Sequence, residues 1–213
     1  MQILGVDPAR EEVPRRALEV LLEGGIVAFP TDTYYALGAA ATNAGAVARV
    51  FTAKRRPPTD ALPVLVADRD QWRSVVAELP EIALSLAGRF WPGALTIVCR
   101  RAPHLPPVLT GGGETIGARQ PNFAVALGLC RALGQPLTGT SANTHGMLPP
   151  VTASQVALDL GQAVDMILDG GRCPVARPST VIDVTRTPPV IVRAGAVGAD
   201  ALREALGEAA ARA

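Results

Sequence analysis

Apolar residues recur along this chain at two spacings, which predict helices and strands. Between residues 10 and 23 they fall three or four positions apart, as on one helix face, and Gly24-Gly25 then ends the element. The same reasoning predicts further helices over 44–53, 69–89 (in two pieces), 122–133, 153–161 (capped by Thr152) and 199–211. Short apolar runs predict buried strands at 26–29, 62–66, 94–99, 115–119, 137–140, 179–184 and 190–192.

The order of these elements favours a mixed sheet. Pairs of strands fall between helices at irregular intervals, so we expect an α/β (α+β) fold in which helices pack on a mixed sheet. Segments 102–114 and 144–150 are rich in Pro and Gly and should form surface loops. Because no linker, repeat or low-complexity segment interrupts residues 1–213, the sequence predicts a single domain.

The composition excludes several classes of protein. With 48% hydrophobic and 18% charged residues the chain is not disordered, and 20 Lys and Arg against 19 Asp and Glu give no overall polyanion-binding charge. The three cysteines, without a CxxC motif, fit buried positions in a reducing compartment better than a structural zinc site. The sequence begins without a signal-peptide pattern and has no membrane-spanning apolar run, so we expect a cytoplasmic protein without membrane association.

The usual glycine-rich phosphate loops are missing from the sequence. It contains no GxxxxGK[ST] motif and no GxGxxG after a strand, and it has no GxSxG nucleophile elbow either. A phosphate ligand would therefore be held by side-chain cations and hydroxyls.

Two pairs of polar residues could form such a site. Lys54 and Arg56 lie two positions apart before a proline, so in an extended segment both cations would face one triphosphate. The alternative is a solvated basic turn that caps the preceding helix. Ser141 and Asn143 have the same spacing at the end of a buried strand, where α/β proteins bind ligands, although both residues are also common in turns.

Polar residues at three other strand ends are further candidates. Residues 30–33 follow a buried strand, and their hydroxyls and carboxylate could bind an amino acid or form a turn. Arg119 and Arg193 each follow an apolar stretch, and a buried arginine needs an anion, either a ligand or a protein carboxylate such as Asp32 or Asp183.

Taken together and in this order, these motifs resemble the YrdC family of threonylcarbamoyl-AMP synthases. The resemblance extends from about residue 10 to residue 197. The family's signature is the pair of KxR and SxN motifs, which here are Lys54 to Arg56 and Ser141 to Asn143. The segments that carry the resemblance are 29–35, 54–57, 91–93, 119, 141–143 and 179–183. It implies a twisted, open α/β sheet with a deep, positively lined concave face. It also implies an enzyme, a nucleotidyltransferase that converts L-threonine, bicarbonate and ATP into threonylcarbamoyl-AMP and pyrophosphate.

The resemblance also implies roles for individual residues and for partners. Catalysis would rest on Lys54 and Arg56, acting on ATP with Mg²⁺ and without a metal-ligating side chain. Nucleotide binding would use Lys54, Arg56, Asp60, Thr115, Ser141, Asn143 and Arg193. Threonine binding would use Thr33, Leu65, Arg119, Gly139 and Ser179. Separate proteins would then transfer the threonylcarbamoyl group to tRNA, and tRNA or double-stranded RNA is a possible partner of the chain itself.

Several positions depart from the family's usual pattern. Asp60 adds a carboxylate near the expected triphosphate, which could bind metal or weaken ATP binding, and Leu65 stands where many members carry His. The chain is expected to be the short, single-domain form. One alternative is a paralogue of the same fold that binds RNA or nucleotide without this activity, although scarce aromatics and near-zero net charge count against an RNA-only module. Another is a module of larger hydrogenase-maturation proteins, which is not expected for a stand-alone chain without acylphosphatase or zinc-finger segments.

Overall fold

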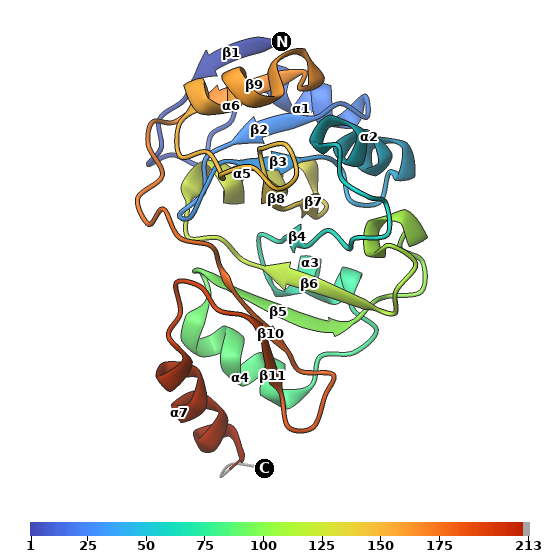
Figure 1. Ribbon diagram of the computed structural model, residues 1–213, viewed down its shortest axis with the longest axis vertical. Helices are drawn as coiled ribbons and strands as arrows, with labels where there is room; N and C mark the ends of the chain where they lie inside the picture. The colour runs from blue at the N-terminus through green and yellow to red at the C-terminus, as the bar shows by residue number, and fades with distance from the viewer. Residues whose placement is uncertain (211–213) are drawn as a thin grey trace.

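The strands are divided between two mixed sheets. The computed structural model describes residues 1–210, and their side chains as far as residue 207. One sheet has the order β1 (Gln2–Gly5), β9 (Met166–Asp169), β2 (Val27–Phe29), β3 (Ala36–Gly38) and β8 (Thr140–Ser141). The other has the order β11 (Val190–Arg193), β10 (Thr180–Asp183), β5 (Leu95–Arg100), β6 (Thr115–Arg119), β4 (Val64–Leu65) and β7 (Leu137–Thr138). Figure 1 shows the five-stranded sheet above the six-stranded one, and the bridge between Ala40 and Leu137 connects them.

Helices pack against both sheets. They are α1 (Arg15–Leu22), α2 (Ala44–Lys54), α3 (Arg69–Val75), α4 (Glu81–Phe90), α5 (Ala124–Leu133), α6 (Ala153–Leu160) and α7 (Ala199–Ala210), with 3₁₀ turns η1 (Pro107–Thr110) and η2 (Gly161–Ala163). Helix α7 packs on α4 beside the six-stranded sheet (Figure 1). Among the helices described, none is both long enough and apolar enough to cross a membrane.

Local sequence signals explain several helix ends. The side chain of Asn43 accepts a hydrogen bond from the backbone N–H of Ala46 at the start of α2. Thr152 caps α6 as predicted, in a capping box completed by Gln155. The first helix starts at Arg15, after Pro14, rather than at the predicted residue 10, because proline suits the start of a helix but not its interior.

The mixed α/β architecture is confirmed. The predicted single strand 137–140 was wrong, because its residues are divided between β7 and β8, which belong to different sheets. The predictions also missed three strands. These are β1, β3 and β9. Two of the three were hard to recognise: β1 lies largely exposed at a sheet edge, and β3 consists of Ala, Leu and Gly, which have little strand preference. The predicted last helix is α7, and its predicted final residue, 211, lies outside the described residues.

The larger hydrophobic cluster extends across both sheets. It includes Tyr35 and Leu37 from the five-stranded side and Ile97 and Ile182 from the six-stranded side. Trp72 belongs to this cluster and Trp91 packs against it, with their rings tilted by 55° and the ring centroids 4.5 Å apart. This shared core holds the two sheets against each other and so fixes the walls of the space between them.

Candidate active site

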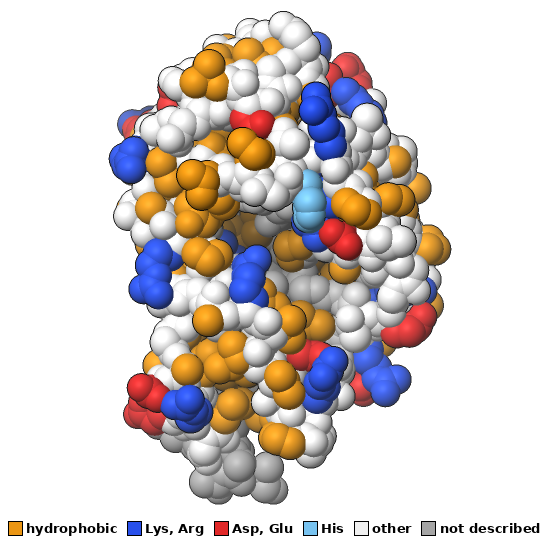
Figure 2. Space-filling view, viewed as in Figure 1, with side chains coloured by type: hydrophobic (Ala, Val, Ile, Leu, Met, Phe, Trp, Pro, Cys, Tyr) orange, Lys and Arg blue, Asp and Glu red, His pale blue; other side chains and the backbone are white. Residues whose placement is uncertain are grey.

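A cavity of about 410 Å³ is lined by residues of both sheets. Figure 2 shows the molecule hollowed near the middle of this face, with Lys and Arg side chains at the edges of the hollow. Among the described residues, those lining the cavity include three arginines, Arg56, Arg119 and Arg193, and no carboxylate. The cavity therefore has the positive lining that was predicted, and it favours an anionic ligand.

Arg119 lies at the floor of the cavity as the last residue of β6. Its side chain is buried, with 6% of the residue exposed. The guanidinium donates from Nε to the carbonyl of Gly93 (2.8 Å) and from Nη1 to Thr33 Oγ1 (2.8 Å), and Nη2 pairs with the carboxylate of Asp32. Burial lowers the pKa of Arg119, and the Asp32 charge opposes that shift. The predicted alternative of a protein carboxylate partner is thus confirmed for Asp32.

These three hydrogen bonds do not use all the N–H donors of Arg119. A guanidinium has five N–H donors, and the bonds to Gly93, Thr33 and Asp32 use three of them, which leaves two. Because Arg119 also lines the cavity, its remaining donors can serve a ligand carboxylate.

The loop between β2 and β3 presents a buried pair of hydroxyls beside Arg119. The Oγ1 atoms of Thr31 and Thr33 lie 3.0 Å apart, and Thr31 donates to the backbone carbonyl of Tyr34 (2.7 Å). Both threonines line the cavity. The predicted polar segment 30–33 therefore forms the turn that was one of its two interpretations, and two of its hydroxyls line the cavity. Binding of an amino acid by this segment stays a prediction.

Ser179 and Arg193 form a second polar group at the ends of β10 and β11. Arg193 donates from Nη2 to the backbone carbonyl (2.8 Å) and to the Oγ (3.0 Å) of Ser179, and Ser179 Oγ lies 2.9 Å from Thr96 Oγ1. Burial and the nearby Arg56 lower the pKa of Arg193. Asp183 pairs with Arg186 instead (3.1 Å), so the suggestion that Asp183 could be a partner of Arg193 was wrong.

Lys54 and Arg56 separate at the end of α2. Arg55, between them, has a left-handed conformation with φ of +50°, so the predicted extended segment with both cations facing one way was wrong. Arg56 lines the cavity, donates from Nη2 to the carbonyl of Ala61 (2.9 Å) and has Nε 3.6 Å from Asp60 Oδ2. Burial lowers the pKa of Arg56, and Asp60 opposes this.

Lys54 is buried behind the cavity, with 2% of the residue exposed. Its ammonium donates to the backbone carbonyls of Ser141 and Asn143 (2.6 Å for Asn143). Burial, and secondarily Arg56, lowers the pKa of Lys54 to about 8, against the opposing charge of Asp159. The amine thereby ties the end of α2 to the segment after β8.

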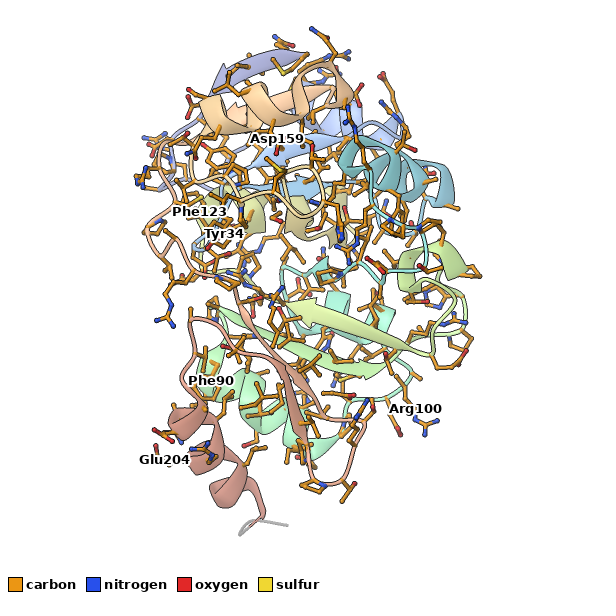
Figure 3. All side chains as sticks on the ribbon, in the orientation of Figure 1. Tyr34, Phe90, Arg100, Phe123, Asp159 and Glu204 are labelled. Carbon is orange, nitrogen blue, oxygen red and sulfur yellow. The ribbon has the colours of Figure 1, made fainter. Side chains whose placement is uncertain are left out.

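The loop after Asn143 is held from a second side by α6. Asp159, labelled in Figure 3, accepts hydrogen bonds from the backbone N–H (2.9 Å) and the hydroxyl (2.7 Å) of Thr144. Asn143 donates to the carbonyls of Thr144 (2.9 Å) and Met147 (2.8 Å), and its buried Oδ1 has no hydrogen-bond partner among the described residues. These bonds hold the SxN segment in place, and with it Ser141, which lines the cavity.

Some of the remaining candidate residues line the cavity and others do not. Ser141, Gly139 and Leu65 line it together with the arginines, Thr33 and Ser179. Four others do not appear among its lining residues: Lys54, Asp60, Thr115 and Asn143. Thr115 begins β6, four residues before Arg119, which at the rise of a strand is about 13 Å away.

Sequence reasoning did not select several residues of the lining. Thr96 is the clearest case, because a hydroxyl in the otherwise apolar run 94–99 needs a buried partner, which is Ser179. Tyr34, Pro149 and Val192 also line the cavity. Tyr34 carried no signal beyond its place in the 29–35 motif, and neither Pro149 nor Val192 gave one of its own.

Replacing Gly139 with alanine is expected to push Leu65 into the cavity. A Cβ at Gly139 would lie 2.7 Å from Leu65 Cγ, so we expect a loss of about 1–3 kcal/mol in unfolding free energy, measured by urea unfolding. Gly88→Ala is the matched control, because a Cβ there meets nothing within 4 Å. Unchanged stability in Gly139→Ala would contradict the close packing.

The sequence of this chain is similar to those of known proteins. The Sua5/YciO/YrdC family model, described as "Telomere recombination", matches residues 19–195. The chain is 40% identical to the threonylcarbamoyl-AMP synthase of Pyrococcus abyssi and 39% identical to that of Bacillus subtilis, over 91% and 90% of its length. It spans 57% and 56% of the length of these two relatives.

A solved structure agrees with the sequence comparison. The crystal structure of P. abyssi Sua5 complexed with L-threonine superimposes with a TM-score of 0.92 at 39% identity, covering 98% of this chain and 62% of that one. The chain therefore belongs to the Sua5/YciO/YrdC family.

Proposed function

We propose that this chain is a threonylcarbamoyl-AMP synthase, a nucleotidyltransferase that converts L-threonine, bicarbonate and ATP into threonylcarbamoyl-AMP and pyrophosphate. The observation that carries the proposal is the cavity, whose described lining combines three arginines with threonine and serine hydroxyls and contains no carboxylate. Such a lining suits a reaction between two anions. The names of the P. abyssi and B. subtilis relatives support the same activity.

The reaction needs little covalent chemistry from the protein. The threonine amine and bicarbonate form a carbamate and water. A carbamate oxygen then attacks the α-phosphorus of ATP, and the bond from that phosphorus to the oxygen bridging to the β-phosphate breaks, so that pyrophosphate leaves with the electron pair. The enzyme's task is to hold the two anions in line and to offset the charge on the phosphates.

Arg119 and Thr33 are the proposed anchor for threonine. The two guanidinium donors that remain can bind the substrate carboxylate. The ion pair with Asp32 meanwhile holds the guanidinium of Arg119 in one orientation. Ser179 and Gly139 line the same cavity, and Leu65 gives it an apolar surface for the substrate methyl group.

The proposed nucleotide site is the part of the cavity between Arg56 and Arg193. These side chains are close enough for the Arg56 charge to lower the pKa of Arg193, so their fields add at a bound phosphate. Ser141 supplies a hydroxyl, and Lys54 acts through the backbone of the SxN segment. Nucleotide contacts by Asp60, Thr115 and Asn143 stay predictions, since those residues lie outside the lining.

Mg²⁺ fits this proposal as part of the substrate. Magnesium is bound in proteins by carboxylates and by substrate phosphates, and the described lining has no carboxylate. Among the described residues, no three His, Cys, Asp or Glu side chains gather around one point either. The chain thus does not fit a resident magnesium site, and the ion would enter bound to the triphosphate of ATP.

The product defines the partners that we propose. Threonylcarbamoyl-AMP is a mixed anhydride, so a second protein system must accept it and transfer its threonylcarbamoyl group to tRNA in the cytoplasm. An RNA- or nucleotide-binding paralogue without this activity is the contrasting outcome of the test below.

Pyrophosphate release from labelled ATP tests the proposal. We expect release that requires threonine and bicarbonate together and falls by about 10- to 100-fold in Arg56→Ala, because a charge-assisted phosphate bond is lost. Arg55→Ala is the matched control, since Arg55 is the neighbouring arginine and does not line this cavity. A folded protein that binds nucleotide or RNA without threonine-dependent release would contradict the synthase assignment.

A further inference from the structure

Asp60 places a negative charge beside the positive cavity without entering it. Its Oδ2 lies 3.6 Å from Arg56 Nε, and its side chain is 40% exposed where that of Arg56 is 20% exposed. Arg56 belongs to the cavity lining and Asp60 does not. The carboxylate therefore stands on the outer side of an arginine that faces the ligand space.

The backbone around Asp60 is firmly held. Its N–H donates to the carbonyl of Pro57 (3.1 Å), and Leu62, two residues before β4, donates from its N–H to the carbonyl of Leu109 in η1 (2.9 Å). Thr59 packs so closely on Gly111 that a Cβ there would lie 2.2 Å from the Thr59 carbonyl. These contacts hold the backbone on both sides of Asp60, which favours a position of its carboxylate near Arg56.

The contact between the two side chains is electrostatic rather than a hydrogen bond. A separation of 3.6 Å is too long for a hydrogen bond, and Arg56 Nε is buried with no hydrogen-bond partner among the described residues. Arg56 is instead positioned by its bond to the Ala61 carbonyl (2.9 Å). Neutralising Asp60 should therefore leave Arg56 in place and raise the net positive charge of the site.

We propose that Asp60 is a specificity-determining residue whose charge limits how tightly the cavity holds polyphosphate, most of all ligands of high charge. Repulsion between the carboxylate and a bound anion grows with the charge of that anion. Three arginines facing one cavity would otherwise retain a pyrophosphate product. The significance for product release rests on the proposed function, whereas the effect on polyphosphate affinity does not.

Calorimetric titration with inorganic pyrophosphate and with orthophosphate tests this inference on Asp60→Asn, which keeps the shape and removes the charge. We expect the dissociation constant for pyrophosphate to fall by about three- to tenfold at low salt, the constant for orthophosphate to change less, and the difference to shrink at high salt. Asp70→Asn is the control, because Asp70 on α3 also pairs with an arginine, Arg73 (3.3 Å), and neither residue lines the cavity.

The outcomes separate this inference from the proposed function. Equal or weaker pyrophosphate binding in Asp60→Asn, an equal gain in Asp70→Asn, or no measurable binding in either wild type or Asp60→Asn overturns the role of Asp60. A gain for pyrophosphate in a protein that shows no threonine-dependent turnover supports the role of Asp60 and contradicts only the synthase assignment.

Discussion

Lys54→Met is expected to lower synthase activity by about 100-fold while the protein stays folded. The methionine keeps the length of the buried stem but loses both hydrogen bonds to the carbonyls of Ser141 and Asn143, so the SxN segment shifts. Misplacing a binding wall by about 1 Å costs about two orders of magnitude in rate. The measurement is kcat/KM for ATP beside thermal unfolding, and undiminished kcat/KM would contradict the positioning role.

Lys54→Arg provides the control, through the pH dependence of activity. In the wild type the ammonium has a pKa of about 8, so activity should decline as the pH rises above about 8 and the charged donor is lost. An arginine at this position stays charged, so that decline should move to higher pH. A decline at the same pH in both proteins would assign it to another group.

The same titration should affect stability in the opposite sense. Burial depresses the folded pKa of Lys54 from 10.5 to about 8, so between these values the unfolded chain holds a proton that the folded chain has released. The unfolding free energy therefore gains a contribution as the pH rises through this window. The rise should be absent in Lys54→Met.

Arg119→Met is expected to be the most destabilising change in the site. It leaves the Asp32 carboxylate buried without its partner, which costs about 3–5 kcal/mol in unfolding free energy. It also removes the proposed anchor for the threonine carboxylate, and we expect threonine affinity to fall by about 30-fold or more. Urea unfolding and calorimetric titration with L-threonine measure the two effects.

Adding Asp32→Asn to this variant separates the two effects. The double variant has no unpaired buried charge, so much of the lost stability should return, while threonine binding should not. If threonine binding returned together with stability, Arg119 would serve only to balance Asp32. The threonine-binding role proposed for Arg119 would then be withdrawn.

The fold was predictable where a segment's own residues decide its structure. The apolar run around Ile97 and the capped helix after Thr152 were recognised because residues adjacent in the sequence determine the buried strand and the helix cap. Strand β3 was not, since its small residues become a strand only through pairing with β2 and β8. Likewise, the division of the strands into two sheets depends on long-range pairing that no local pattern contains.

The candidate site shows the same limit. Arg119 was recognised because a cation that ends an apolar strand must find an anion, and Asp32 is that anion. The position of Lys54 was not predictable, because it depends on the left-handed conformation of Arg55 and on carbonyls almost ninety residues away, at Ser141 (87) and Asn143 (89). Spacing predicted which residues matter, and only the tertiary structure shows which of them face the cavity.

The hydrogen bonds of the buried hydroxyls in the β2–β3 loop run in one direction, and this direction bears on the ligand. A hydroxyl has one proton, and because Thr31 gives its own to the Tyr34 carbonyl, the bond between the threonines must run from Thr33 to Thr31. Thr33 also receives a hydrogen bond from Arg119, so toward the cavity it can offer only a lone pair. The floor of the cavity is thus divided into a donor at Arg119 and an acceptor at Thr33, which matches the carboxylate and the amine of one α-amino acid.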